Sequence, residues 1–182
     1  MKRKNILDAA VKLLATNGLH ATPMSAIAKA AGTGMGTIYN YFGTKEILIN
    51  AIYVDIKQQQ ESLIPGFNPE ESVKEQFERY YLTVTNFYLE HPGYYRVMDQ
   101  LRGSPIITAE SKLLGEKGIQ PVIALLQQGQ QEGLIKDFSM DELLQFISGT
   151  ILAHLGWQLN SPGRNPSSLS NQLKMVWDAV KK

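Results

Sequence analysis

Residues 30 to 46, AAGTGMGTIYNYFGTKE, contain the arrangement of residue types in this chain that most suggests chemistry. Glycines alternate at positions 32, 34 and 36, as they would in a loop that cradles phosphate or in a turn between two helices that bind DNA. A dinucleotide-binding loop requires Gly-x-Gly-x-x-Gly after a β-strand, and a P-loop requires Gly-x-x-x-x-Gly-Lys-Ser/Thr. Position 37 is threonine, the preceding SAIAKAA is typical of a helix, and no Lys-Ser or Lys-Thr follows the glycines. The pattern therefore disfavours a phosphate loop.

A helix-turn-helix accounts for more of this segment. Gly32 can end one helix in the left-handed conformation, and Thr33 and Gly34 can form a tight turn and cap the next helix. A helix over residues 35–42 is too short to be stable alone. We therefore expect Ile38 and Phe42 to hold it by packing on the two preceding helices.

The other face of this short helix carries hydrogen-bonding side chains without charge, namely Thr37, Tyr39, Asn40 and Tyr41. Such a face suits base edges in a major groove, with tyrosine hydroxyls reaching phosphates. Lys45 lies in the first turn of the following helix, where a bound phosphate would satisfy both the lysine and the free N–H groups. The alternative interpretation is a solvent-facing helix with two tyrosines, followed by a solvated lysine.

The net charge of +1 conceals an uneven distribution. Residues 1–50 carry six basic and two acidic groups, whereas residues 51–182 carry twelve basic and fifteen acidic groups. The basic first part can attract a polyanion, and the acidic remainder does not. Lys2, Arg3 and Lys4 are expected to form a basic arm that contacts phosphates. The charge alone is also consistent with an uneven surface of no functional meaning.

The sequence shows no pattern typical of an enzyme or a metal site. It contains no cysteine, which excludes disulfides and thiolate metal ligands and favours a reducing cytoplasm. His20, His91 and His154 lie far apart, and none belongs to a catalytic or metal-binding motif. Asp8 and Lys12 interrupt the apolar run near the N-terminus, so it is neither a signal peptide nor a membrane span. We expect a cytoplasmic protein without catalytic site, metal, cofactor or membrane partner.

The remaining sequence predicts an all-α fold of about nine helices, because apolar residues repeat at helical spacing and no period-two run is sustained. Start signals place Thr22 as the N-cap of the second helix, Asn68 as the N-cap of a long helix that ends near His91, and Ser139 in a capping box. Residues 107–132 are typical of one helix weakened by two glycines and a proline, and residues 160–168 of a loop. We predict a helix-turn-helix DNA-binding domain at 1–48 and a helical ligand-sensing and dimerisation domain at 49–182.

The segment TPMSAIAKAAGTGMGTIYNYFGTKEIL resembles the DNA-binding signature of TetR-type repressors. The residues at matching positions are Thr22, Ile27, Ala28, Ala31, Gly32, Gly36, Thr37, Tyr39, Tyr41, Phe42, Lys45 and Leu48. The resemblance covers about residues 4–50 and implies a homodimer that binds a two-fold, palindromic site on double-stranded DNA. It also implies a set of DNA-binding residues: Thr22, Ser25, Thr33, Met35, Gly36, Thr37, Tyr39, Asn40, Tyr41 and Lys45.

Three departures from the signature affect the expected DNA contacts. The Val-Ser usual in the turn is Thr33-Gly34 here, so Thr33 replaces serine as the hydroxyl that can reach a phosphate. Ser25 occupies a position that is often basic and contributes no charge. Met35 occupies a recognition position that is often Lys, Arg or Pro, and it offers apolar contact to a thymine methyl but no bidentate bond to guanine. Specificity is therefore expected to depend on Thr37, Asn40 and DNA shape.

The remainder of the chain is expected to bind a ligand and to dimerise. Aromatic residues cluster at helical spacing, which is also typical of an ordinary core, but the many tyrosine hydroxyls favour a ligand site. The residues predicted to line it are Phe77, Tyr80, Tyr81, Phe87, Tyr88, Tyr95, Met98 and Trp157. Small residues at helical steps favour close helix packing between subunits, and the predicted interface is Phe146, Gly149, Ala153, Gly156, Leu169, Leu173 and Trp177.

These observations together predict a ligand-responsive transcriptional regulator. The most consistent form is a repressor that a small apolar or aromatic effector releases from a palindromic operator. The alternative is an all-helical interaction or scaffold module that does not bind DNA.

Overall fold

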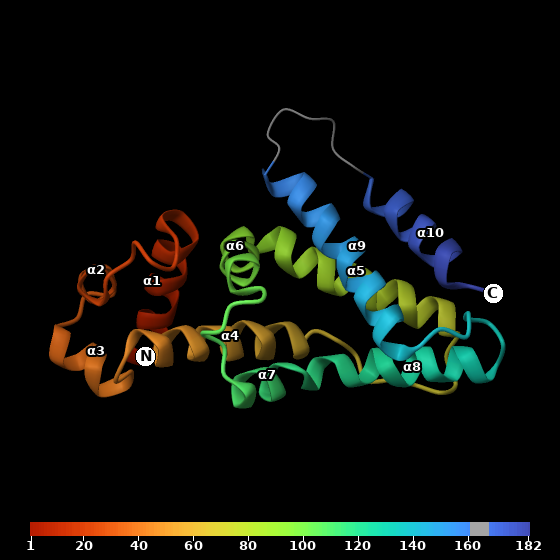
Figure 1. The fold of residues 1–182 in the computed structure, drawn as a ribbon, viewed down its shortest axis with the longest axis horizontal. Helices are drawn as coiled ribbons and strands as arrows, with labels where there is room; N and C mark the ends of the chain where they lie inside the picture. The colour runs from red at the N-terminus through yellow and green to blue at the C-terminus, as the bar shows by residue number, and fades with distance from the viewer. Residues whose placement is uncertain (161–167) are drawn as a thin grey trace. The chain divides into compact units, whose positions relative to one another are not determined.

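The structure is a computed structural model that describes residues 1–160 and 168–182 (Figure 1). These residues form ten α-helices and one turn of 3₁₀ helix, with no strand among them, which confirms the all-α prediction. The predicted loop at 160–168 lies almost wholly outside the described residues. The chain forms two compact units, residues 1–59 with 91–117 and residues 60–90 with 118–182. Because the chain passes between them three times, no single cut separates them, and the predicted domain boundary at 48/49 stays a prediction.

The first unit contains the three helices that precede the connecting helix. Its elements are α1 (Lys2–Asn17), α2 (Met24–Ala30), α3 (Met35–Tyr41), the larger part of α4 (Lys45–Glu61), α6 (Pro92–Leu101) and α7 (Ala109–Gly115). α1 packs against α2 and α6, and α2 packs against α3. Residues 1–44, called the head from here on, bury Ile6, Leu14 and Ile27 almost completely. α1 ends at Gly18, whose φ of 88° lies in the positive region that favours glycine.

Two amide side chains fasten the head and α4 to the rest of the first unit. The Gln100 amide on α6 donates to the carbonyl oxygen of Leu14 at 3.1 Å and accepts from the backbone N–H of Leu19 at 3.0 Å. The Asn50 amide on α4 donates to the carbonyl oxygen of Ile106 at 2.8 Å and accepts from the N–H of Thr108 at 3.0 Å. Each amide binds main-chain groups with both its donor and its acceptor, so it fixes orientation as well as distance.

The second unit surrounds one long helix. Its elements are α5 (Val73–Glu90), α8 (Gln120–Gln131), α9 (Met140–Asn160) and α10 (Leu169–Val180). α5 packs against α8, α9 and α10, and α9 packs against α8 and α10. Phe77 and Tyr81 of α5 are completely buried, and the Phe77 ring lies 5.3 Å from that of Trp177. The predicted capping box forms at α9, where Ser139 and Glu142 exchange hydrogen bonds.

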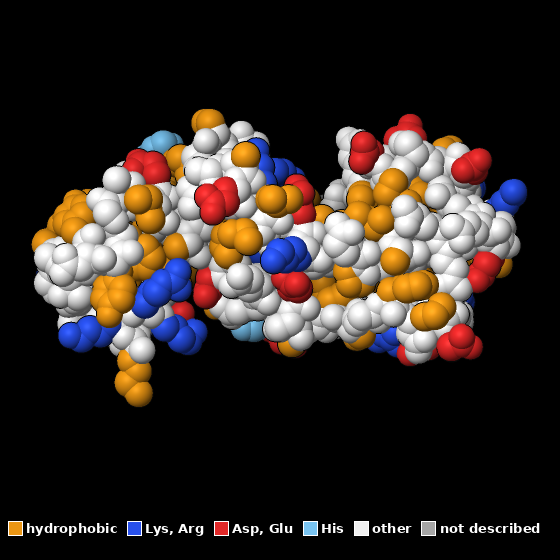
Figure 2. Space-filling view, turned by 90° about the horizontal axis from the view of Figure 1, so that it is seen from below, with side chains coloured by type: hydrophobic (Ala, Val, Ile, Leu, Met, Phe, Trp, Pro, Cys, Tyr) orange, Lys and Arg blue, Asp and Glu red, His pale blue; other side chains and the backbone are white. Residues whose placement is uncertain are grey.

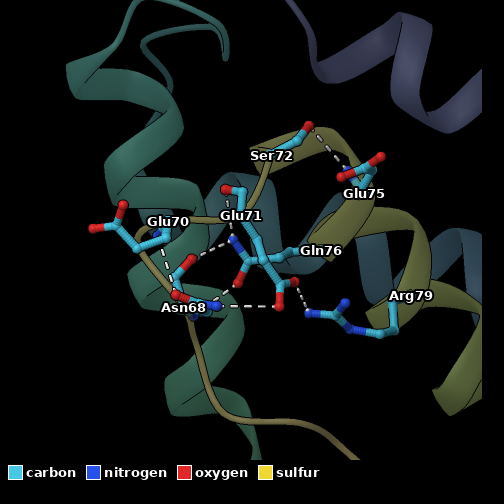
Figure 3. Close-up of polar contacts among 7 residues, drawn as sticks. All are labelled: Asn68, Glu70, Glu71, Ser72, Glu75, Gln76 and Arg79. Atoms are coloured by element: carbon cyan, nitrogen blue, oxygen red, sulfur yellow. Dashed lines mark hydrogen bonds and ion pairs between the residues drawn. The ribbon is translucent and has the colours of Figure 1, made fainter.

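α5 begins four residues later than predicted (Figure 3). Asn68 does bond to Glu70 N–H and to Glu71, as a capping residue would, but it caps a turn that the helix does not continue. The buried amide of Gln76 accepts from the N–H of Asn68 at 2.9 Å and donates to its carbonyl oxygen at 2.8 Å. Glu71 pairs with Arg79, which holds the pKa of that carboxyl below its usual value. These side-chain bonds from Gln76 and Arg79 satisfy polar groups of residues 68–71, so this segment stays a loop instead of joining the helix.

The single helix predicted for residues 107–132 is also wrong. The structure divides this segment into α7, a 3₁₀ turn η1 (Lys117–Ile119) and α8. α7 ends at Gly115, where an added Cβ would lie 2.8 Å from Cε1 of Tyr53, so α4 and α7 approach closely at that point. Pro121 lies in the first turn of α8, where its missing N–H costs nothing. The glycines and proline that were expected to weaken one helix therefore separate two.

Gly129 of α8 provides a test of the core of the second unit. A Cβ at this position would lie 2.6 Å from Cδ1 of Ile135 and 3.1 Å from Cγ1 of Val73, both of them buried. We expect Gly129→Ala to lower the free energy of unfolding by about 1–3 kcal/mol, because the core has no room for the methyl group. Thermal unfolding measures this, with Gly36→Ala as the matched control because open space surrounds that helical glycine. Equal midpoints for wild type and Gly129→Ala would contradict the packing described.

Candidate nucleic-acid interface

The turn between α2 and α3 forms as the glycine pattern predicted. Gly32 has a φ of 63°, and the N–H of Thr33 donates to the carbonyl oxygen of Ala28 at 2.9 Å, which closes the end of α2. Gly34 is extended and precedes the first residue of α3. Ile38 is completely buried and Phe42 is 2% exposed, so these two side chains hold the seven-residue α3 in place.

The opposite face of α3 is open. Tyr39 and Tyr41 are each 46% exposed and Met35 is 39% exposed, while Asn40 is also exposed and Thr37 half-buried. Among the described residues, no hydrogen bond or ion pair engages the polar ends of Tyr39, Asn40 or Tyr41. A row of free donors and acceptors therefore lies on a helix that the core holds rigidly, which is the arrangement needed to read base edges.

Thr22 differs from its predicted roles. Its side chain is completely buried, and its hydroxyl donates to the carbonyl oxygen of Gly18 at 2.9 Å. The predicted N-cap is wrong, because Pro23 occupies the cap position of α2 and no side chain caps it. Thr22 ties the end of α1 to the start of α2, so its side chain does not belong to the open surface. Of the other predicted residues, Ser25 and Gly36 are exposed and Thr33 is half-buried.

Lys45 is half-buried at the start of α4, and its ammonium donates to the carbonyl oxygen of His20 at 3.5 Å. The neighbouring helix-terminal N–H groups already have partners. The N–H of Ile47 donates to the Thr44 hydroxyl at 3.2 Å. The Glu46 carboxylate accepts from its own N–H, which lowers the pKa of that group. A phosphate at this end would therefore be bound by the Lys45 ammonium rather than by the free amides that the sequence suggested.

The predicted basic arm is part of α1 rather than a free segment. α1 begins at Lys2, and the N–H of Asn5 donates to the carbonyl oxygen of Met1 at 3.2 Å. The guanidinium of Arg3 lies 5.5 Å from the centre of the Phe42 ring, and Lys4 pairs with Asp8 at 3.5 Å. Figure 2 shows Lys and Arg side chains gathered beside this end of the chain. The positive charges of Lys2, Arg3 and Lys4 therefore lie on the first turn of a helix.

Most residues predicted to line a ligand site are core residues in this structure. Phe77, Tyr81, Phe87 and Tyr88 are buried in the second unit, and Tyr95 is buried in the first. Met98 is half-buried, and Trp157 is 45% exposed. Tyr80 lines a small pocket with the loop at residues 64–67 and α8, and burial raises the pKa of its hydroxyl to about 12.

The predicted dimer residues fall into two groups. On α9, Phe146 is 44% exposed, Gly149 and Ala153 are exposed and Gly156 is half-buried. On α10, Leu173 is buried in the core of the second unit, and Leu169 and Trp177 are half-buried. Sequence reasoning missed Met175, which is 61% exposed on α10. The α9 group therefore forms an uncovered apolar face, whereas much of the α10 group packs inside.

Two short helices joined by a glycine turn, with a free polar face on the second, define a helix-turn-helix DNA-binding protein. The family model for bacterial regulatory proteins of the tetR family matches residues 6–52. The fatty acid metabolism regulator protein of Bacillus subtilis (strain 168) is 31% identical over 183 residues, covering 94% of this chain and 91% of that protein. The chain belongs to the TetR family of transcriptional regulators, which are not enzymes.

Two further comparisons agree with this assignment. The HTH-type transcriptional regulator UidR of Escherichia coli (strain K12) is 42% identical over 65 residues, which is 36% of this chain and 32% of that protein. A TetR family transcription regulator from Marinobacter aquaeolei VT8, known from a crystal structure, is 28% identical with a TM-score of 0.87 and covers 100% of this chain and 96% of that one. Among the helices described, none is long and apolar enough to cross a membrane. No group of three or more His, Asp or Glu residues in the described parts could hold a metal ion.

Lys45 gives a quantitative test of the interface. We expect Lys45→Met to reduce the slope of log affinity against log salt concentration by about one for each Lys45 that contacts a phosphate. Binding of the full chain to a duplex of random sequence at several salt concentrations measures this slope. Lys112→Met on α7 is the matched control, because Lys112 is exposed and far along the chain from the head. An unchanged slope in Lys45→Met would place the phosphate contact elsewhere.

Proposed function

We propose that this protein is a ligand-responsive repressor that binds a palindromic operator as a homodimer and leaves it when an effector binds. The observation that carries the proposal is the free polar face of α3 on a head whose core holds that helix rigidly. The class of DNA-binding regulator follows from the family, whereas repression, the palindrome and the effector are proposals. A protein that acts on DNA in this way works in the cytoplasm.

The exposed residues of the head suggest separate roles in binding. Asn40 can bond to an adenine through both ends of its amide, and Met35 can contact a thymine methyl. Tyr39 and Tyr41 can donate to phosphates, together with Lys45. Ser25, Thr33, Gly36 and Thr37 complete the proposed surface. Base reading then depends on few hydrogen bonds, so DNA shape contributes a larger share of the specificity.

Selection of duplexes from a random pool by the full chain tests this function. We expect palindromic sequences, and we expect Asn40→Ala to lose about 1–3 kcal/mol of discrimination at the base pair it contacts. Asn86→Ala is the matched control because Asn86 is exposed on α5, away from the head sequence. Failure to recover any palindrome across salt conditions would count against the proposal, and an unchanged preference in Asn40→Ala would remove that residue from the base contacts.

The uncovered face of α9 supports the homodimer. Phe146, Gly149 and Ala153 line an open hollow whose surface is mainly apolar. Glu142, Gln145 and Thr150 of the same helix and Gln172 of α10 complete its lining. Exposed apolar residues that are contiguous mark interaction sites, and small residues among them allow a second helix to approach closely. A two-fold protein presents two copies of α3 to the two halves of a palindrome. We therefore propose that α9 packs against its counterpart in a second copy.

Gly149→Arg tests this interface without disturbing the subunit. A Cβ added at Gly149 meets no other part of the subunit within 4 Å, so an arginine can start into open space and is expected to interfere mainly with a partner. We expect a monomer by sedimentation velocity and an affinity for the palindromic duplex about a hundredfold or more weaker, because the second half-site is no longer bound intramolecularly. Ser148→Arg, on a different face of the same helix, should leave both unchanged. A Gly149→Arg protein that remains dimeric would place the interface elsewhere.

The effector and its route to the head remain part of the proposal. The Bacillus subtilis relative is named a fatty acid metabolism regulator, which suggests a molecule with an acyl chain as the effector class here. α5 of the second unit ends at Glu90 and α6 of the first begins at Pro92, so a shift of α5 moves the start of α6. Gln100 on α6 bonds to Leu14 before the end of α1 and to Leu19 after it, and in this way α6 sets the orientation of the head.

A further inference from the structure

One buried side chain in the second unit lacks the partners that its neighbours have. His154 on α9 is 4% exposed, and neither ring nitrogen has a hydrogen-bond partner among the described residues. The side-chain oxygen of Gln128 on α8 also lacks a partner, but the buried polar groups of α5 are satisfied. Tyr81 donates to the Thr150 hydroxyl at 3.2 Å, Tyr88 donates to Gln60 at 3.0 Å, and the Thr85 hydroxyl donates to the Tyr81 carbonyl oxygen at 2.8 Å. His154 is therefore the one buried side chain of the described residues in which every polar atom lacks a partner.

Helical spacing places His154 on the same face of α9 as Thr150, which bonds to α5. Thr150 lies one turn before His154 on α9, and its hydroxyl accepts the hydrogen bond that Tyr81 of α5 donates. Ile147, Ile151 and Leu155 are buried on the same helix, and α9 packs directly against α5. Burial lowers the pKa of His154, so the ring is held in the neutral form. A neutral imidazole has one N–H donor and one nitrogen acceptor, and here both are unused.

An unpartnered polar group in an apolar core destabilises the folded state, since it loses its hydrogen bonds to water and gains none. A leucine would fill the same space without this cost. A residue that weakens the fold in this way is explained when a molecule absent from the resting state supplies the missing partner.

We propose that His154 is the polar anchor of the effector site, and that it binds the carboxyl group of a small molecule whose apolar part lies between α5 and α9. This inference rests on the proposed function, in which the second unit binds an effector. A carboxylic acid offers one donor and one acceptor, which matches the two free ring nitrogens. Wherever the shared proton lies, the pair carries no net charge, so it can be buried at little electrostatic cost.

Because the ring is enclosed, an effector reaches it only when the packing of α5 on α9 opens. Opening displaces α5, and α5 is joined to α6 by a single residue, His91. The same event that satisfies His154 therefore supplies the movement that the Gln100 link passes to the head.

Thermal unfolding of the full chain with and without decanoic acid tests the proposal, with His154→Leu and His154→Gln as variants. Without probe, His154→Leu should unfold roughly 2–4 °C above wild type, since it removes the unsatisfied group. Decanoic acid should raise the midpoint of wild type and of His154→Gln, whose amide also donates and accepts, and should bind His154→Leu at least about tenfold more weakly. His20→Leu is the matched control because His20 is exposed.

Three outcomes would overturn the proposal. One is a His154→Leu protein that unfolds at or below the wild-type temperature. The second is decanoic acid that stabilises His154→Leu as much as wild type, or stabilises neither. The third is equal dependence on His154 for 1-decanol and methyl decanoate, which would show that no carboxyl is recognised. If the same preparations still bind the selected palindromic duplex, the proposed DNA-binding function stands and this inference alone fails.

Discussion

The burial of Ile38 and Phe42 is the constraint on which the rest of the head depends. α3 has seven residues, and an isolated helix of that length is unstable in water. Two large side chains that are almost completely removed from solvent contribute roughly 1.5–3 kcal/mol each. That contribution holds a helix whose other face has no internal partners. The open row of Tyr39, Asn40 and Tyr41 exists because the opposite side of the same helix is so well packed.

Side-chain bonds to main-chain groups make the head a unit of defined geometry. Thr22 ties the two sides of the α1–α2 connection together, Gln100 bonds across the same connection from α6, and Asn50 holds α4 to residues 106–108. Such bonds are directional, whereas apolar packing alone tolerates small rotations. In the proposed homodimer, this rigidity would help to align two recognition helices on one duplex, because displacement of either head by a few ångströms spoils the fit.

The two units place polar groups in opposite ways. In the head, unpartnered polar groups lie on the surface, where water satisfies them until DNA replaces it. In the second unit, His154 is unpartnered among the described residues and only 4% exposed, so it is largely removed from bulk solvent. The first arrangement costs little and waits for a ligand from outside, whereas the second costs stability and favours a ligand that enters the core. In the proposed function, recognition of DNA and sensing of a small molecule thus depend on different energetics in the two units.

The sequence by itself determined the all-α class, the glycine turn and the inward and outward faces of α3, because these follow from local periodicity and from the conformational freedom of Gly32. It did not determine where α5 begins, that residues 107–132 divide, or that Thr22 points inward. The start of α5 depends on the loop bonds of Gln76, the division of 107–132 on the close approach of Tyr53, and the direction of Thr22 on its bond to Gly18. A local sequence pattern does not predict such contacts between distant residues or loop groups. The unpartnered state of His154 is likewise a property of the tertiary structure alone, since burial and the absence of a neighbour are decided only when α5 and α9 meet.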